Sequence, residues 1–442
     1  MTITEKTALK YKTAPLKCWP LAKELRANHY QEIAQAREQG RLISTGSVHS
    51  FRSVLAGLGD FVHLGGEPYG ASAAVDPNFA VECAEAVESR GYARDLCSYM
   101  RNYWGSMFIN KYAFGGKFPK ADLIFQSQIC ESQGKWYQVV KEFEGVPYYC
   151  VDYPITPTGG GEEWKEDYVV GQLHEAIKWM EKVTGRTYDD EKLIEAVKNE
   201  CRTTSLWGEI CLLNQAIPAP LDQKTMISLH VNSILMRHKP EVVKFFEILK
   251  EEVQERVKNG IAALPTERLR LSFEGMPIWF YLDIFKFLEQ YGAACVMSNY
   301  IIYLAGTLEE TSDGIFIRRP TPQDLGKTPR NREEALRTLV RWVRHPLSWF
   351  PIIFSMPQDK RSDAGVRLVK QWHIDGVVMH MNRGCEGVAI GMKENRLALI
   401  DAGVPITVFE GNAGDRREFD EAQTIKRLET FMESMGLRKL EG

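Results

Sequence analysis

The chain has 442 residues, of which 44% are hydrophobic and 26% are charged, and its 55 Lys and Arg nearly balance its 58 Asp and Glu. This length is enough for two or three packed domains, and a net charge of −3 argues against a protein that binds nucleic acid through a basic surface. No apolar run approaches the roughly 20 residues that cross a membrane, and no signal peptide opens the sequence, so we expect a cytoplasmic protein without membrane contacts.

The order of the predicted elements indicates two α/β domains separated by helices. Strand patterns such as ADLIFQS and GVPYYCVDYP alternate with helical patterns in the first third, and the alternation returns after LRLSFEG. Such alternation is typical of parallel sheets with crossover helices. The predicted fold class is therefore α/β, with two similar Rossmann/flavodoxin-like parallel-sheet domains and an intervening helical region. We divide the chain into an N-terminal tail, a first α/β domain, a helical region and a second α/β domain, at 1–20, 21–160, 161–265 and 266–442.

The cysteines do not form a disulfide or zinc pattern. There are nine, an odd number, at positions 18, 83, 97, 130, 150, 201, 211, 295 and 385, and no two form C-x-x-C. In a long chain without a secretion signal this argues against a disulfide framework. Most cysteines of this kind pack as small hydrophobic side chains, so a functional role needs positional evidence.

An internal repeat supplies that evidence for two cysteines. Asp122 and Asp375 each precede a buried strand, Cys130 and Cys385 follow these strands, and Gly-Val-Pro opens the next strand in both copies. Ligands of open α/β sheets bind at the carboxyl ends of the strands, where helix N-termini would lower a thiol pKa. The repeat predicts functional roles for Cys130 and Cys385, with core packing as an equal alternative.

Three stretches together resemble a known family. They are ARDLCSYMRNYWG around Cys97, LIFQSQICESQGKW around Cys130 and GVVMHMNRGCEGVAIG around Cys385, and the tail VFEGNAGDRREFDEAQTIKRLETFMESM completes the pattern. The chain resembles the 2-hydroxyacyl-CoA dehydratase family over residues 20–438. Within that family it resembles the larger, cluster-carrying subunit of ATP-dependent (class I) benzoyl-CoA reductase.

The resemblance implies an iron–sulfur protein. It assigns Cys97, Cys130 and Cys385 as the ligands of a 4Fe–4S cluster that keeps one iron open, and thiolates are the usual ligands of such clusters. The other six cysteines have no counterpart and are expected to pack, with a double-cubane cluster as the alternative. Because the chain lacks G-x-x-x-x-G-K-[ST], ATP is expected to bind only to a partner ATPase.

For function, the resemblance implies ATP-dependent reduction of the benzoyl-CoA ring to a cyclohexadienoyl-CoA by low-potential one-electron steps. The implied partners are a smaller homologous three-cysteine subunit, an ATP-hydrolysing iron–sulfur activator, ferredoxin as electron source and an aromatic acyl-CoA substrate. The alternatives are a subunit of a 2-hydroxyacyl-CoA dehydratase, in which a radical anion expels hydroxide, and a noncatalytic electron-relay subunit. A metal-free α/β protein with incidental cysteines is the remaining hypothesis.

The remaining candidates are polar and aromatic residues near these motifs. We predict His49, in ISTGSVHS, and Glu67, after Gly65-Gly66, as catalytic residues, with a turn histidine and a solvated loop acid as the alternatives. His380 is expected to be a core residue. Aromatic side chains near the motifs favour a planar acyl group as substrate, although packing in the core explains these side chains equally well. They are Tyr99, Tyr103, Trp104, Phe108 and Trp136. Nonspecific candidates for contacts to the CoA phosphates are Lys111, Lys117 and Arg383.

Overall fold

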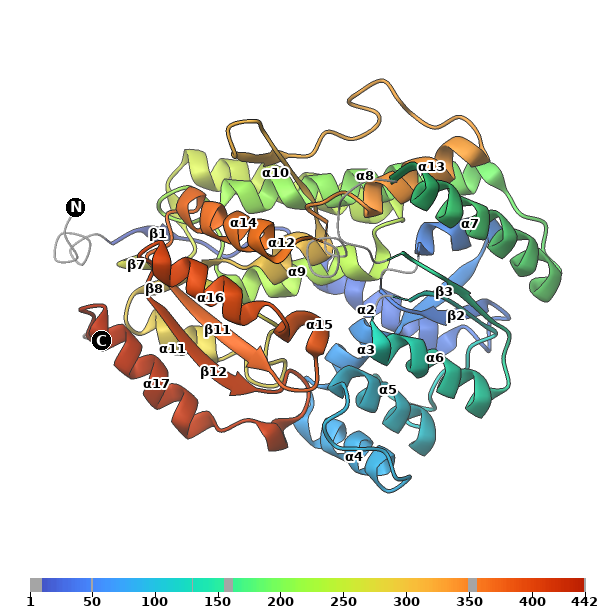
Figure 1. Ribbon diagram of the computed structural model, residues 1–442, viewed down its shortest axis with the longest axis horizontal. Helices are drawn as coiled ribbons and strands as arrows, with labels where there is room; N and C mark the ends of the chain where they lie inside the picture. The colour runs from blue at the N-terminus through green and yellow to red at the C-terminus, as the bar shows by residue number, and fades with distance from the viewer. Residues whose placement is uncertain (1–9, 49–50, 129, 155–161, 349–355, 441–442) are drawn as a thin grey trace.

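A computed structural model describes residues 10–48, 51–128, 130–154, 162–348 and 356–440. It contains two four-stranded parallel sheets (Figure 1). The strands of the first sheet are β2 (Leu42–Gly46), β3 (Phe61–Gly65), β4 (Leu123–Ser127) and β5 (Tyr148–Val151), and those of the second are β7 (Leu269–Glu274), β8 (Ala293–Met297), β11 (Gly376–Asn382) and β12 (Ile406–Gly411). The spatial orders are β3-β2-β4-β5 and β8-β7-β11-β12. If the strands of each sheet are counted along the chain, both orders are 2-1-3-4.

The predicted α/β class with two similar parallel sheets is therefore confirmed. β4 and β8 are buried along their whole lengths, as expected for strands that helices cover on both faces. Helices associated with the first sheet are α2 (Trp19–Gln35), η1 (Arg52–Leu58), α3 (Gly66–Ala73), α4 (Pro77–Glu88), α5 (Ser98–Ile109) and α6 (Glu131–Glu144). Those that follow β7 are α11 (Ile284–Glu289), α12 (Asn299–Ala305), α13 (Arg332–Val343), α14 (Gln358–Gln371), α15 (Glu386–Ala389), α16 (Met392–Asp401), η3 (Arg416–Glu418) and α17 (Glu421–Ser434).

The sequence repeat has a physical counterpart in the two sheets. Asp122 exchanges two hydrogen bonds with Ile43, the second residue of β2: its backbone N–H donates to the Ile43 carbonyl (2.7 Å), and its carboxylate accepts from the Ile43 N–H (2.8 Å). Asp375 makes the same pair of bonds with Arg270, the second residue of β7, at 2.8 Å each. Each repeated Asp therefore holds the third strand of its sheet in register with the first.

The proline of each Gly-Val-Pro copy repeats as well. The Pro147 carbonyl accepts from the Ile124 N–H (2.8 Å), and the Pro405 carbonyl accepts from the Val377 N–H (2.9 Å). A proline suits the start of an edge strand because it has no N–H to donate to the ladder.

Four long helices lie between the two sheets in the sequence: α7 (Glu162–Thr184), α8 (Asp190–Leu213), α9 (Gln223–Met236) and α10 (Pro240–Lys258). Asp189 and Asp222 begin α8 and α9 by accepting hydrogen bonds from first-turn N–H groups. α13 packs on α7 and α8, and α2 packs on α9, so helices from both flanking segments join this layer (Figure 1). The domain boundaries themselves stay a prediction.

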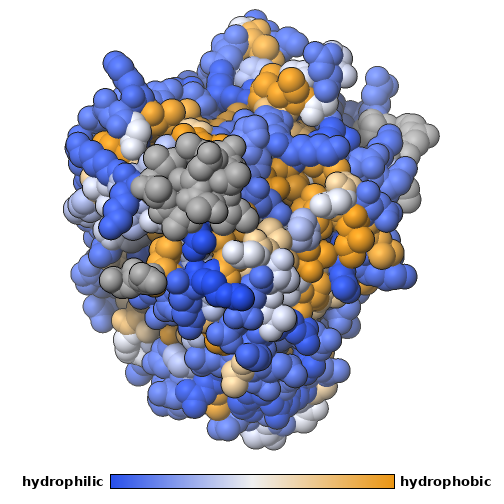
Figure 2. All heavy atoms as spheres, turned by 90° about the vertical axis from the view of Figure 1, so that its left-hand side faces the viewer, coloured by the Kyte–Doolittle hydropathy of each residue, from blue (hydrophilic) through white to orange (hydrophobic). Residues whose placement is uncertain are grey.

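Two short strand pairs complete the fold. β1 (Lys12–Thr13) pairs in parallel with β6 (Ile261–Ala262), and β9 (Leu308–Glu310) pairs antiparallel with β10 (Phe316–Arg318). Among the described residues, no helix is long and apolar enough to cross a membrane. Figure 2 shows mainly hydrophilic side chains on one face of the molecule, with groups of hydrophobic ones among them.

Candidate functional site

A cavity of about 560 Å³ lies where the carboxyl ends of the two sheets meet. Residues at equivalent positions of the two sheets line this cavity. Val48, Glu67 and Cys130 follow the first, second and third strands of the first sheet, and Met276, Tyr300 and Cys385 follow the corresponding strands of the second sheet. Cys97 also lines this cavity. The three cysteines assigned by resemblance are thus brought together from positions up to 288 residues apart in the sequence (385 − 97).

Each of these cysteines is the N-cap residue of a helix: Cys97 of α5, Cys130 of α6 and Cys385 of α15. First-turn N–H groups reach all three thiols and lower their pKa values, but burial raises them more. The net pKa is above the ordinary thiol value at each position, and that of Cys130 is raised to about 12. The sequence-based expectation of a lowered thiol pKa is therefore wrong in net direction, because desolvation outweighs the helix N-terminus.

Two contacts bring the cysteine loops of the two halves together. Gly384 has a φ of +71°, and a Cβ atom there would lie 2.8 Å from the Asp95 carbonyl oxygen and 3.1 Å from that of Leu96. The loop before Cys385 therefore approaches the loop before Cys97 so closely that only glycine fits without a shift.

The second contact is a buried ion pair one turn into α5. The fully buried Arg101 side chain bonds Asp415 (2.9 Å) and Glu88 (3.2 Å), and Arg417 bonds Asp415 (2.7 Å) from the other side. Burial opposes ionisation of Asp415, yet hydrogen bonds from Arg417 and Arg101 lower its pKa to about 2. The acidic and basic tail that contributed to the family resemblance thus anchors the helix that begins at Cys97.

Glu67 lies on the cavity wall in the first turn of α3. One carboxylate oxygen accepts from the Val48 N–H (2.9 Å), and the other is in contact with the Gln133 side-chain amide. Burial raises its pKa to about 7, although backbone hydrogen bonds and Arg52 act in the opposite direction. A carboxyl group with this pKa can exchange a proton at neutral pH.

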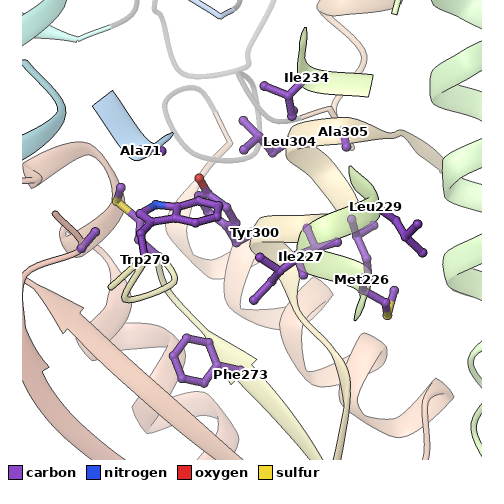
Figure 3. Close-up of a cluster of buried hydrophobic side chains, with 14 of the residues drawn as sticks. Ala71, Met226, Ile227, Leu229, Ile234, Phe273, Trp279, Tyr300, Leu304 and Ala305 are labelled. Carbon is purple, nitrogen blue, oxygen red and sulfur yellow. The ribbon is translucent and has the colours of Figure 1, made fainter. Parts of the chain in front are cut away.

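Aromatic side chains form much of the remaining wall. The Trp279 indole N–H donates to the Tyr99 hydroxyl (2.5 Å), and the Tyr99 hydroxyl bonds that of Tyr300. Figure 3 shows Trp279 and Tyr300 beside Ala71 and Ile227. Trp136 also lines the cavity. Of the aromatic residues predicted from the sequence, Tyr99 and Trp136 reach the cavity, whereas Tyr103 and Trp104 are packed in the core and Phe108 packs against it.

The other predicted residues lie elsewhere. His49 is outside the described residues, and His380 is a core residue stacked on Phe409, as expected. Five of the six remaining cysteines are buried and Cys150 lies on β5. Lys111 pairs with Glu82 and Arg383 with Glu410. Neither these two residues nor Lys117 is among the described residues that line the cavity.

Sequence reasoning missed Trp279, Tyr300 and His230, which also line the cavity. Tyr300 is the second residue of α12, just as Glu67 is the second residue of α3. The repeat therefore carried a signal for Tyr300, whereas Trp279 and His230 reach the cavity through tertiary packing alone.

The residues fit an iron–sulfur cluster better than a single ion. Within the described ranges, no three His, Cys, Asp or Glu side chains stand close enough together to hold a metal ion. A cubane holds its cysteine sulfurs farther apart than a single ion does. Three thiols on one cavity, each within reach of helix N–H groups, suit such a group because it deprotonates them and the N–H groups stabilise its sulfurs.

The chain is similar in sequence to known proteins over most of its length. The chain is 26% identical to the (R)-2-hydroxyisocaproyl-CoA dehydratase alpha subunit of Clostridioides difficile, over 94% of this chain and 95% of that protein. It is 24% identical to the (R)-phenyllactyl-CoA dehydratase alpha subunit of Clostridium sporogenes, over 94% and 97%. It is 27% identical to the (R)-2-hydroxyglutaryl-CoA dehydratase subunit alpha of Acidaminococcus fermentans, over 72% and 61%. Residues 70–435 match the family model described as 2-hydroxyglutaryl-CoA dehydratase, D-component, and the chain belongs to that family.

Proposed function

We propose that the chain is the cluster-carrying subunit of a 2-hydroxyacyl-CoA dehydratase, which removes water from a 2-hydroxyacyl thioester to give an enoyl-CoA. The observation that carries this proposal is the single cavity shared by three cysteines and the half-buried Glu67. The relatives reported above are dehydratase subunits, and this favours dehydration over the reductase activity that the sequence resemblance suggested.

Cys97, Cys130 and Cys385 would hold a 4Fe–4S cluster, which supplies single electrons at low potential when bound. The remaining cysteines do not support a double-cubane cluster, since none of the six is among the described cavity-lining residues. The wall of Trp136, Trp279 and other apolar side chains excludes water and so protects a radical substrate.

Glu67 is the residue proposed to move a proton in this site. Its carboxyl group is fixed by Val48 and Gln133, and its raised pKa of about 7 allows it to give or take a proton during turnover. His49 follows Val48 directly in the sequence and stays a proposed second proton carrier.

Benzoyl-CoA reduction stays a second candidate because the Trp136 and Trp279 rings suit a planar acyl group. The cavity, however, also presents polar atoms that a benzoyl ring would leave unpaired, namely the side-chain carbonyl oxygen of Gln133 and Nε2 of His230. Leaving a buried polar group unpaired costs about 1–3 kcal/mol. This chemistry favours a substrate that carries a hydroxyl group, and it favours a substrate-binding subunit over a noncatalytic electron relay.

The subunit is proposed to work in a complex in the cytoplasm. Its partners would be a smaller homologous three-cysteine subunit and an ATP-hydrolysing iron–sulfur activator that receives electrons from ferredoxin. We expect the chain alone, supplied with dithionite, to turn over far more slowly than the reconstituted system with ATP.

Cysteine substitutions and product analysis test the proposal together. We expect Cys97→Ser, Cys130→Ser and Cys385→Ser each to lower the iron bound per chain and to abolish turnover, whereas the buried controls Cys201→Ser and Cys211→Ser keep their iron. In the anaerobic reconstituted system, enoyl-CoA should form from a 2-hydroxyacyl-CoA. Normal iron in all three site variants would refute the cluster assignment, and dienoyl-CoA formed from benzoyl-CoA with 2-hydroxyacyl-CoAs untouched would establish the reductase instead.

A further inference from the structure

One wall of the cavity comes from α9, a helix of the middle layer that the sequence did not connect with the site. Ile227, His230, Val231 and Ile234 line the cavity and follow the helical spacing of three and four residues. Figure 3 shows Ile227 and Ile234 on this wall, with Trp279 and Tyr300 nearby. His230 is the only ionisable side chain that the described part of α9 contributes to the cavity.

The structure fixes which nitrogen of His230 carries the proton. Its Nδ1 lies 2.5 Å from the Ile227 carbonyl oxygen, and a carbonyl oxygen can only accept, so Nδ1 must donate. Burial lowers the pKa of His230 to about 4, which keeps the ring neutral at physiological pH. In a neutral ring with the proton on Nδ1, Nε2 is a hydrogen-bond acceptor, and no donor from the described residues bonds it.

The ring is held in place beside the proposed reacting centre. Its plane is nearly parallel to that of Trp279 (11°, centroids 6.5 Å apart) and tilted by 68° to that of Tyr300 (6.2 Å). Tyr300 lines the same cavity as Cys97, Cys130 and Cys385. His230 is therefore in ring contact with a side chain that shares the cavity wall with the cysteines.

The cavity carries few cations. Among the described residues that line it, Arg26 is the only Lys or Arg, whereas four carry carboxyl groups: Glu67, Asp76, Glu131 and Glu386. The Arg26 guanidinium donates to the Ser228 carbonyl oxygen (3.3 Å). The exposed side chains of Val75 and Phe114 also line the cavity. The part of the wall formed by Ile227, Trp279 and Met276 thus offers no cation to a second carboxylate on the substrate, whose burial without a partner would be costly.

We propose that His230 Nε2 accepts a hydrogen bond from the 2-hydroxyl group of the substrate, and that the acyl chain bound against α9 is neutral and apolar. This inference rests on the proposed dehydratase function and adds its substrate class and a specificity-determining residue. His230 acts by orienting the hydroxyl group, and the hydrogen bond distinguishes a 2-hydroxyacyl thioester from the same thioester without the hydroxyl.

Binding measurements without ATP or reductant test this inference apart from turnover. The anaerobic complex of the chain with its partner subunit is titrated with 2-hydroxyhexanoyl-CoA, hexanoyl-CoA and 2-hydroxyadipoyl-CoA, which differ only in the hydroxyl or in a terminal carboxylate. We expect 2-hydroxyhexanoyl-CoA to bind at least about tenfold more tightly than either of the others. In His230→Phe the preference over hexanoyl-CoA should fall to about one, with hexanoyl-CoA affinity and iron content unchanged.

Two further variants keep the test decisive. His230→Gln retains an acceptor and should recover part of the preference, whereas His29→Phe, at a neutral buried histidine outside the cavity, should leave it intact. A wild-type preference in His230→Phe would overturn the role of His230, and equal binding of 2-hydroxyadipoyl-CoA would overturn the neutral acyl class. If the wild-type complex bound none of the thioesters, the proposed function itself would fail.

Discussion

Gly384→Ala tests whether the contact between the two cysteine loops positions the site. The added Cβ would lie 2.8 Å from the Asp95 carbonyl oxygen, and backbone atoms cannot rotate away as a side chain would. The left-handed conformation at φ +71° costs a non-glycine residue about 1–2 kcal/mol, and overpacking adds about 1–3 kcal/mol. We expect a total loss of about 2–5 kcal/mol and a lower iron content, because the loops of Cys97 and Cys385 must separate.

Gly403→Ala is the matched control. Gly403 has a similar φ of +78° but nothing within 4 Å of its added Cβ, so it carries the conformational cost without the contact. The change in unfolded-chain entropy is the same for both substitutions and cancels between them. Anaerobic urea unfolding and iron analysis are the assays. If Gly384→Ala matched Gly403→Ala in both stability and iron, the loop contact would have no role in holding the site.

Two other variants test the charges around the site. Glu67 has a folded pKa of about 7, above its ordinary value of 4.5, so ionisation favours the unfolded chain as pH rises between these values. Glu67→Gln should therefore gain stability relative to wild type from pH 5 to pH 8 in urea unfolding, with loss of turnover, and a constant difference would contradict the raised pKa. Asp415→Asn should cost about 3 kcal/mol because it leaves the buried Arg101 short of a counter-charge. Asp420→Asn, at an exposed N-cap, should change stability by less than about 0.5 kcal/mol, and equal losses in the two variants would refute the buried pair.

The sequence repeat predicted more of the fold than its short length suggested. Asp122 and Asp375, and the prolines of the two Gly-Val-Pro copies, make matching backbone contacts in the two sheets. These bonds join the third strand of each sheet to its first and fourth strands at matching positions in the two halves. The repeat therefore predicted two similar α/β halves with Cys130 and Cys385 after their strands, whereas the strand order comes from the structure.

Other features of the site could not be read from local pattern. Cys97 begins α5, and no cysteine holds a corresponding place in the second copy, so only the family resemblance pointed to it. Trp279 and His230 reach the cavity from a loop and from the middle helical layer, through contacts between residues far apart in the sequence. The thiol pKa values were predicted in the wrong direction because helix ends are visible in a sequence, whereas burial is a property of the assembled fold.

The asymmetry between the two similar halves explains why the site requires the whole chain. Two of the three cysteines come from the first half and one from the second, so neither sheet alone can supply the set. The contacts that join the halves, Gly384 on Asp95 and Arg101 with Asp415, lie beside the cysteine loops themselves. The same contacts therefore pack the two halves together and hold the loops that carry Cys97 and Cys385 against each other. A substitution that loosens this interface should impair the site before it unfolds either sheet, because each sheet keeps its own register contacts.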